Sequence, residues 1–420
     1  MAVYLHLFET EAQFRDKRIN DYYEPWASLT EESNDRVDYN KTEDEKLFNT
    51  PFAIEALGSG NITWALGDKT VQYSKNGGSW ESMDSGTTIS VVEWDEVQFK
   101  GTNTNYSGNT ISTTTQFNVK GNIMSLTDGD EFETADTVNA NGFRGLFSGC
   151  TYLVSAGNLK LPSTTLASYC YSSMFRNCTG LTTAPELPAM TLVEACYANM
   201  FQGCTNLTTA PELPATTLAT YSYSYMFRGC TGLTTAPAIS ATTLAEYCCS
   251  NMFQDCTSLT TAPELPATTL ATRCYYYMFR DCTGLTTAPE ELPATTLASS
   301  CYNYMFQGCT SLVSAPKLPA TTLVNSCYSN MFNGCTSLTT APELPATALE
   351  NYCYQSMFSG CTNLAYIKAM FTTIPGSVYT SNWVSGVAAS GTFVKNSAAT
   401  WTTTGVNGIP TGWTVQTASS

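Results

Sequence analysis

The chain has 420 residues, of which 43% are hydrophobic, a composition typical of folded proteins rather than disordered ones. Its 35 acidic side chains outnumber the 19 basic ones and give a formal net charge of -16. Nucleic acids and anionic membranes are bound through clusters of Lys and Arg, so this charge argues against both as partners. No run of about 18 apolar residues occurs, and we therefore expect no membrane insertion.

Residues 1–50 interleave charged and aromatic side chains and are too few and too polar to bury a core of their own. A segment of this kind is either solvated or ordered by a partner. The N-terminus lacks the basic stretch, apolar stretch and small-residue cleavage site of a secretory signal peptide. We expect the protein to fold in a cytoplasm and residues 1–50 to be an attachment segment.

Residues 51–126 contain short β-prone runs separated by Gly, Asn and Asp, among them FAIEAL, NITWAL, ISVVEW and TQFNV. Two further runs, VQYSK and SWESM, flank Asn76-Gly77-Gly78, which predicts a hairpin. A small β-sandwich is the natural way for such strands to close. Residues 127–145 read as a linker and a cap at the start of the next region.

A Met-Phe pair returns at a fixed interval in the following region. Successive pairs are 26 residues apart, with one interval of 27, and Leu146-Phe147 forms an atypical first copy. The pairs begin at Met174, Met200, Met226, Met252, Met278, Met305, Met331 and Met357. A fixed period in this range is the signature of a solenoid, which we place over residues 146–370.

The sequence pattern of each repeat predicts one helix and one short strand. Residues before Met-Phe follow helical spacing and form one apolar face, after a Thr-Thr pair that offers an N-cap. A column of only Gly, Asn and Asp then predicts a helix C-cap. The Thr-rich segment that follows ends at a proline, which predicts a short parallel strand. The expected fold class is an α/β solenoid of about eight coils, each with a helix of about three turns.

Residues 371–420 no longer follow the repeat and are rich in Thr, Gly and Trp. The last coil of a solenoid exposes an apolar edge unless it is capped. We therefore expect a C-terminal cap in which Trp383, Trp401 and Trp413 cover that edge.

All 17 cysteines lie between Cys150 and Cys361, and most of them fall in two columns of the repeat. Their spacing fits neither the C-x-x-C pattern nor the Cys/His mixture of zinc sites. Reduced, buried thiols behave as small apolar residues, so we expect two ladders of thiols facing the core. Cysteines of one column would lie within disulfide range in adjacent coils. We expect no metal and no cofactor.

The sequence does not favour an enzyme. Its one histidine, His6, lies in the polar N-terminal segment, so no Ser or Cys in the repeats has a histidine base. A broken acidic column runs through the repeats at Glu186, Glu212, Glu264, Glu291 and Glu343. We interpret it as a solvated stripe produced by duplication, with calcium bridging as the alternative. We predict no catalytic residues.

The repeat motif MFxGCTxLTTAPxLP is similar to the AFxGCTSLTSITIP pattern of BspA-like leucine-rich repeats, over residues 142 to 370. The resemblance implies a leucine-rich-repeat solenoid that serves as a surface adhesion or recognition module. Here the repeat is longer and Ala-Pro replaces the centre of the family's strand, which shortens the expected strand.

The repeats follow a β module that ends in FNVKGNIMSL and are closed by a GIPTGWTV tail, an arrangement that resembles proteins of gut Bacteroidales and of their crAss-like phages. The stretches FETEAQF, EPWASLTEE and RVDYNK within residues 1–50 resemble N-terminal attachment regions of virion proteins in those phages. This resemblance implies a virion fibre or appendage protein that binds other virion proteins through residues 1–50. A surface adhesin of a gut bacterium is the alternative, and a carbohydrate-active enzyme is a third, disfavoured hypothesis.

Recognition is expected where the repeats differ, at outward positions rich in Tyr, Ser and Asn. Tyrosine gives a large contact area at low entropic cost. The candidate ligand-binding residues are Tyr169, Tyr221, Tyr225, Tyr247, Arg273, Tyr276, Tyr277 and Tyr304. They would bind a glycan or a protein of the host surface, with avidity if the chain forms a homo-oligomer. The alternative is that these positions are solvent-facing and free to vary.

Overall fold

The computed structural model describes residues 42–418. Most of the predicted attachment segment, together with His6, therefore lies outside the described residues. The chain from Glu43 onward forms one compact unit. It opens with a short acidic helix, α2 (Glu43–Phe48).

Eight strands follow and form two sheets. They are β1 (Ala53–Ala56), β2 (Gly60–Trp64), β3 (Val71–Lys75), β4 (Glu81–Met83), β5 (Thr88–Val91), β6 (Glu96–Lys100), β7 (Ile111–Thr113) and β8 (Phe117–Asn122). One sheet has the order β5-β2-β7, and the other has the order β4-β3-β6-β1-β8-β9. The predicted hairpin is confirmed, because β3 pairs antiparallel with β4 and both Asn76 and Gly77 have the positive φ that tight hairpin turns require.

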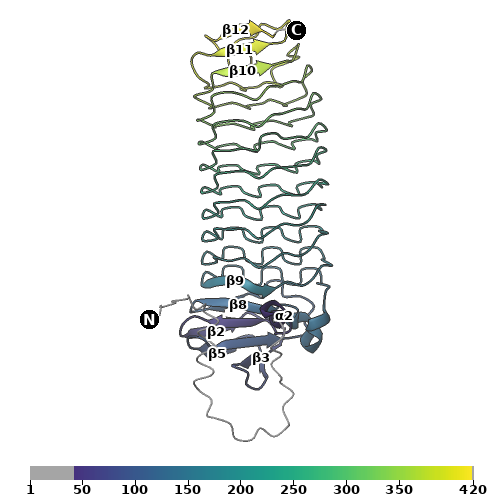
Figure 1. The fold of residues 1–420 in the computed structure, drawn as a ribbon, viewed down its shortest axis with the longest axis vertical. Coiled ribbons are helices and arrows are strands. Elements are labelled where there is room, and N and C mark those ends of the chain that lie inside the picture. The colour runs from purple at the N-terminus through teal and green to yellow at the C-terminus, as the bar shows by residue number, and fades with distance from the viewer. Residues whose placement is uncertain (1–41, 419–420) are drawn as a thin grey trace, which may run out of the picture. The chain divides into compact units, whose positions relative to one another are not determined.

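The large sheet continues into the repeats. After α3 (Ser125–Asp128) and a 3₁₀ helix, η1 (Gly129–Thr134), the chain reaches β9 (Leu153–Lys160), which pairs parallel with β8. Ser155 of β9 forms a parallel bridge to the next repeat, at Thr183. The two regions therefore share one hydrophobic core, which runs from Phe52 to Trp413. Figure 1 shows the repeats stacked between β9 and β10.

The prediction of a helix in each repeat is wrong, because the segment before Met-Phe is a ribbon of tight turns. Alternate amides donate to the next repeat: those of Tyr171, Ser173 and Phe175 reach carbonyl oxygens 3.0, 2.8 and 2.9 Å away. The amides between them close turns within the repeat, as Ser172 does onto the carbonyl of Tyr169 at 3.1 Å. The ribbon therefore joins neighbouring repeats, which a helix cannot do through its backbone.

Left-handed residues explain both the ribbon and the wrong prediction. Every fourth residue has positive φ, as at Tyr169 (61°), Ser173 (59°) and Asn177 (58°), and an α-helix requires negative φ throughout. Each four-residue unit of the ribbon places two adjacent side chains in the core. Buried apolar residues are therefore separated along the sequence by intervals that alternate between one and three residues. That pattern is almost the same as one face of a helix with 3.6 residues per turn. The Gly/Asn/Asp column is left-handed as expected, but it ends the ribbon rather than a helix.

The strand side of each repeat is shorter than a regular strand. The Thr-rich segments contact one another through single parallel bridges, such as Thr209 to Thr235 and Thr261 to Thr287. Proline lacks the amide hydrogen that a longer ladder needs, so the column of prolines limits the pairing.

Stacked aromatic rings fill the core of the repeats. The phenylalanines of the Met-Phe pairs, from Phe147 to Phe358, stack with centroids 5.3 to 5.9 Å apart. A parallel stack of tyrosines includes Tyr171, Tyr197 and Tyr223 and is interrupted where Cys249 takes the tyrosine position. Offset ring stacks of this kind add to the energy of burial.

Three parallel strands form the C-terminal end: β10 (Tyr366–Ala369), β11 (Thr392–Lys395) and β12 (Thr414–Thr417). The side chains of Trp383, Trp401 and Trp413 are buried here. Their indole N–H groups donate to main-chain carbonyls at 2.9, 3.1 and 2.8 Å. Each tryptophan thus contributes apolar area to the core and also ties down a connecting segment.

Within residues 42–418, no helix has both the length and the apolar character needed to cross a membrane.

Candidate functional site

The left-handed positions of the ribbon carry the variable side chains. The inward positions hold Cys, Tyr, Met and Phe, whereas most left-handed positions are partly exposed. We call the surface formed by these positions, together with the arginines near them, the Tyr/Arg face. The candidate residues with positive φ are Tyr169, Tyr221, Tyr225, Tyr247, Arg273, Tyr277 and Tyr304.

The Tyr/Arg face is hollowed near the first repeats by a shallow depression of about 570 Å³. Tyr169, Tyr221 and Tyr225 line it, together with arginines, serines and amides from four successive repeats. The Arg144 guanidinium lies 5.5 Å from the ring centre of Tyr169, and that of Arg228 lies 5.7 Å from the ring of Tyr225. These cation–π contacts hold the rings and the charges in one surface.

The electrostatics of the depression are dominated by three arginines, Arg144, Arg176 and Arg228. Two carboxylates contact its lining residues: Glu194 accepts a hydrogen bond from the Tyr169 hydroxyl at 3.1 Å, and Asp255 lies 3.6 Å from Arg228. This hydrogen bond and, to a lesser extent, burial raise the pKa of Tyr169. The hydroxyl therefore stays protonated at neutral pH and remains a hydrogen-bond donor.

The remaining candidates form a second cluster further along the repeats. The rings of Tyr277 and Tyr304 stack with centroids 4.5 Å apart, and the Tyr276 ring meets that of Tyr277 edge-on at 4.1 Å. The Arg273 guanidinium lies 5.3 Å from the ring of Tyr247 and bonds to its hydroxyl. Burial and the hydrogen bond with Tyr276 raise the pKa of Tyr277 to about 12.

A stacked pair joins the two clusters, since the rings of Tyr221 and Tyr247 lie 4.9 Å apart. The structure thus brings the eight candidate residues into one continuous surface. Sequence reasoning missed Arg144 as a member of the candidate set. Aligning the atypical first copy at Leu146-Phe147 with Met174-Phe175 makes Arg144 equivalent to Ser172, which also lines the depression.

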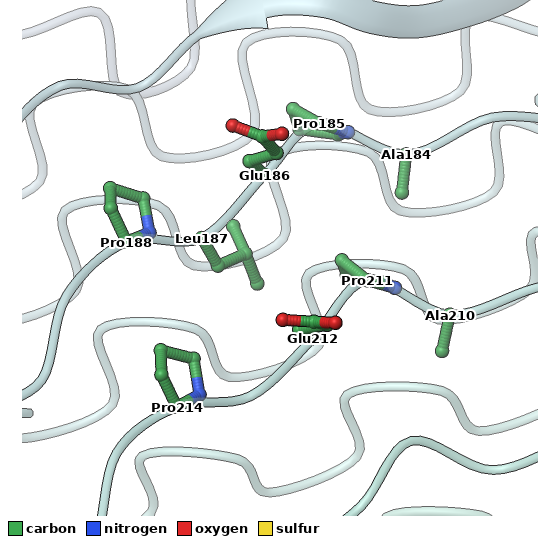
Figure 2. A pocket seen from close by; sticks show the side chains of 9 residues that line it. All are labelled: Ala184, Pro185, Glu186, Leu187, Pro188, Ala210, Pro211, Glu212 and Pro214. Atoms are coloured by element: carbon green, nitrogen blue, oxygen red, sulfur yellow. The ribbon is translucent and has the colours of Figure 1, made fainter.

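A second depression, of about 520 Å³, lies where Pro-Glu-Leu-Pro segments of neighbouring repeats meet. Figure 2 shows Glu186 and Glu212 at equivalent places on two successive repeats, each flanked by prolines. We call this surface the Pro-Glu face. Lysines of neighbouring repeats neutralise part of it: Lys317 pairs with Glu290 at 2.8 Å, which lowers the pKa of Glu290, and Lys368 pairs with Glu343 at 3.0 Å. No group of three or more metal-ligating side chains occurs in the described part of the chain.

The cysteines are free and buried. One column forms a regular hydrogen-bonded ladder, in which each thiol from Cys178 onward donates to the carbonyl of a phenylalanine one repeat earlier, as Cys204 does to Phe175 at 3.0 Å. Burial raises the pKa of Cys230 and Cys361 to about 12. Protonated, enclosed thiols of this kind are neither nucleophiles nor metal ligands at neutral pH.

The repeat region matches a known family of repeat proteins. The family described as "BspA type Leucine rich repeat region" matches six copies, over residues 144–260 and 290–385, together half of the chain. The chain belongs to the BspA-type leucine-rich repeat family. This BspA-type chain is also similar to a solved leucine-rich repeat protein from Bacteroides ovatus ATCC 8483. The identity is 15%, over 55% of this chain and 81% of that one, with a TM-score of 0.20, which is too low to support any argument. No curated protein matches the chain.

Proposed function

We propose that this chain is a non-enzymatic surface-recognition protein of the adhesin type. Its repeats would form a continuous solenoid of about eight coils that presents the Tyr/Arg face to a glycan or protein on a cell surface. The observation that carries the proposal is the continuity of this face. Eight variable residues from five repeats lie in contact with one another or with shared neighbours, rather than being scattered over the surface.

The chemistry of the Tyr/Arg face supports recognition rather than catalysis. Tyrosine and arginine are the residues that supply most of the binding energy in interfaces. The rings are held by stacking and by cation–π contacts, so little side-chain entropy is lost when a partner binds. A homo-oligomer would add avidity, and light scattering coupled to size-exclusion chromatography measures its size.

The setting of the protein is a further part of the proposal. We place it in a phage virion, as a fibre or appendage held to other virion proteins by residues 1–50, because of the resemblance described above. The alternative is an adhesin on the surface of a gut bacterium. Mass spectrometry of purified virions and of bacterial surface fractions separates the two settings. Absence of the chain from intact particles overturns the virion placement and leaves the recognition proposal standing.

Recognition itself is tested with the purified chain, labelled with a fluorophore and applied to intact gut Bacteroidales cells. We expect saturable binding that excess unlabelled chain displaces. Binding that does not saturate, or no binding to any strain of a broad panel, contradicts the adhesin-type function.

A further inference from the structure

We infer that the Tyr/Arg face binds a linear acidic polysaccharide that carries one anionic group per disaccharide. This inference rests on the proposed recognition function and names the chemistry of its ligand. Three observations carry it: an alternation of arginine along the repeats, the local charge of the depression, and the distribution of aromatic rings.

In the first six Met-Phe repeats arginine recurs in every second repeat at the position after Met-Phe, and the last two repeats carry Asn333 and Ser359 there. Arg176, Arg228 and Arg280 alternate there with Gln202, Gln254 and Gln307. The arginines reach solvent: Arg176 is exposed, and the side chains of Arg228 and Arg280 are 38% and 37% exposed. Gln254 is buried instead, and its side chain accepts a hydrogen bond from Asn251 at 2.7 Å.

The spacing of these charges is set by the backbone. Parallel neighbours lie about 4.8 Å apart, so two repeats separate successive arginines by roughly 10 Å. The ring centroids of Phe175, Phe201 and Phe227, which step by 5.5 and 5.6 Å, agree with this spacing. Two sugar units of an extended polysaccharide span a comparable length. A chain with one carboxylate or sulfate per disaccharide therefore places its charges in register with the arginines.

All charged side chains that line the depression are arginines, although the whole chain is strongly acidic. An aspartate accompanies two of the arginines: Asp255 lies 3.6 Å from Arg228, at the edge of the depression, and Asp281 lies 3.1 Å from Arg280, beyond it. For Arg176 the equivalent positions, in its own repeat and in the next, are Asn177 and Gly203, which carry no charge. Among the described residues, Arg176 forms no ion pair. An anionic ligand is therefore favoured at this end of the face.

Aromatic rings and hydroxyls complete a surface suited to sugars. The exposed ring of Tyr221 and the half-buried rings of Tyr169 and Tyr225 line the same depression as the arginines. Apolar faces of pyranose rings pack against aromatic side chains, while Ser173 and Asn199 offer hydrogen-bonding groups to hydroxyls. An acidic protein partner would use the arginines but would not require their two-repeat spacing.

Isothermal titration calorimetry with the full chain tests the inference. The probes are oligosaccharides of hyaluronan, with one carboxylate per disaccharide, and of chondroitin 4-sulfate, which adds a sulfate; neutral dextran and a single-stranded DNA oligonucleotide are the controls. We expect binding of the hyaluronan oligosaccharides, weakened by salt, and much weaker binding of both controls. Binding of chondroitin 4-sulfate alone, with its two anionic groups per disaccharide, overturns the inferred register of one group per disaccharide. Equal binding of the DNA shows attraction to any polyanion and overturns the inference.

Two double variants separate the spacing from the charge. Arg176→Gln with Arg228→Gln is expected to weaken binding about tenfold or more, since charge-assisted contacts are lost. Arg176→Gln with Gln202→Arg keeps the net charge but places the arginines in adjacent repeats, and we expect about threefold weaker binding. The matched control, Lys317→Gln with Lys368→Gln, removes the same charge from the Pro-Glu face and should bind as the unaltered chain does. Full affinity of the spacing variant overturns the two-repeat register.

The same proteins are assayed for binding to intact cells. A chain that adheres to cells but binds neither acidic oligosaccharide overturns this inference and leaves the proposed function intact. A chain that binds the oligosaccharides but no cells supports the inference and counts against the adhesin-type function.

Discussion

The thiol of Cys204 donates a hydrogen bond to the main-chain carbonyl of Phe175, 3.0 Å away in the preceding repeat. The same carbonyl also accepts the amide of Cys178 at 3.1 Å, so both of its lone pairs are used. Equivalent thiol contacts recur along the column at 2.9 to 3.1 Å. A small apolar side chain with one donor suits this place, which explains why cysteine fills the column.

Replacing this thiol tests its role. Cys204→Ala removes a donor and a fully buried sulfur, and we expect it to lower the free energy of unfolding by about 2 kcal/mol. Cys204→Ser keeps a donor and should cost less. Urea unfolding followed by circular dichroism measures both, with exposed Asn206→Ala as the control, expected within about 0.5 kcal/mol of the unaltered protein. A serine variant less stable than the alanine variant contradicts the hydrogen-bonding role.

The buried thiols also make stability depend on pH. Burial raises the pKa of Cys230, Cys301 and Cys361 from 9.0 in the exposed state to about 12. The folded state binds more protons above pH 9, so the stability contributed by these thiols is complete below pH 9 and is lost as the pH rises toward 12. We expect the urea midpoint to be flat from pH 7 to 8.5 and to fall steeply above pH 9. A midpoint unchanged at pH 10.5 contradicts this account of the core.

The left-handed backbone is tested by a pair of alanines. Ala195 has φ of 50°, whereas Ala198 in the same turn ribbon does not have positive φ, and both side chains are buried. Either change to glycine removes one buried methyl group, but only Ala195→Gly relieves the cost of a left-handed non-glycine residue, about 1 kcal/mol. Ala195→Gly should therefore be more stable than Ala198→Gly by about that amount in thermal unfolding. The opposite order argues for a helix at this place.

The C-terminal end is expected to protect the last repeats. The Trp383 ring is fully buried, lies 5.8 Å from the ring of Phe371, and donates to the carbonyl of Gly408 at 2.9 Å. Trp383→Ala should cost about 4 kcal/mol and speed hydrogen exchange first in residues 340–385. Trp383→Phe keeps a ring and should cost less. Uniform acceleration along all repeats would mean that this end does not act as a local cap.

The repeat period and the buried columns could be predicted from the sequence, but the conformation of each repeat could not. Cys170, Tyr171, Met174 and Phe175 face the core as expected, because a four-residue turn unit and a helix place these side chains almost identically. What separates the two conformations is the sign of φ at Tyr169 and at equivalent positions, where tyrosine and arginine give no left-handed signal.

The sequence positions of the candidate site could be predicted from the alignment of the repeats, but the shape and charge of the surface that they form could not. Variation among repeats selected Tyr221 and Tyr247, and their stacking follows from equivalent places in successive repeats. The depression depends on Arg144, which comes from a copy with an altered period, and on the uncharged residues Asn177 and Gly203 beside Arg176. These features determine the local charge and shape of the surface, and the residue types at equivalent positions of the repeats do not predict either.

The central claim is that recognition resides on the Tyr/Arg face rather than on the Pro-Glu face. Two triple variants are compared for binding to the cells that the unaltered chain binds. Tyr221→Asn, Tyr225→Asn and Arg228→Gln remove two rings and a charge, and asparagine tolerates the left-handed backbone at both tyrosines. Glu186→Gln, Glu212→Gln and Glu343→Gln alter the Pro-Glu face to a similar extent.

Flow cytometry with labelled protein gives the apparent affinity of each variant, after circular dichroism has shown that both are folded. The account predicts a loss of about tenfold or more for the Tyr/Arg variant and no loss for the Pro-Glu variant. Unchanged binding by the Tyr/Arg variant, together with loss by the Pro-Glu variant, would contradict it.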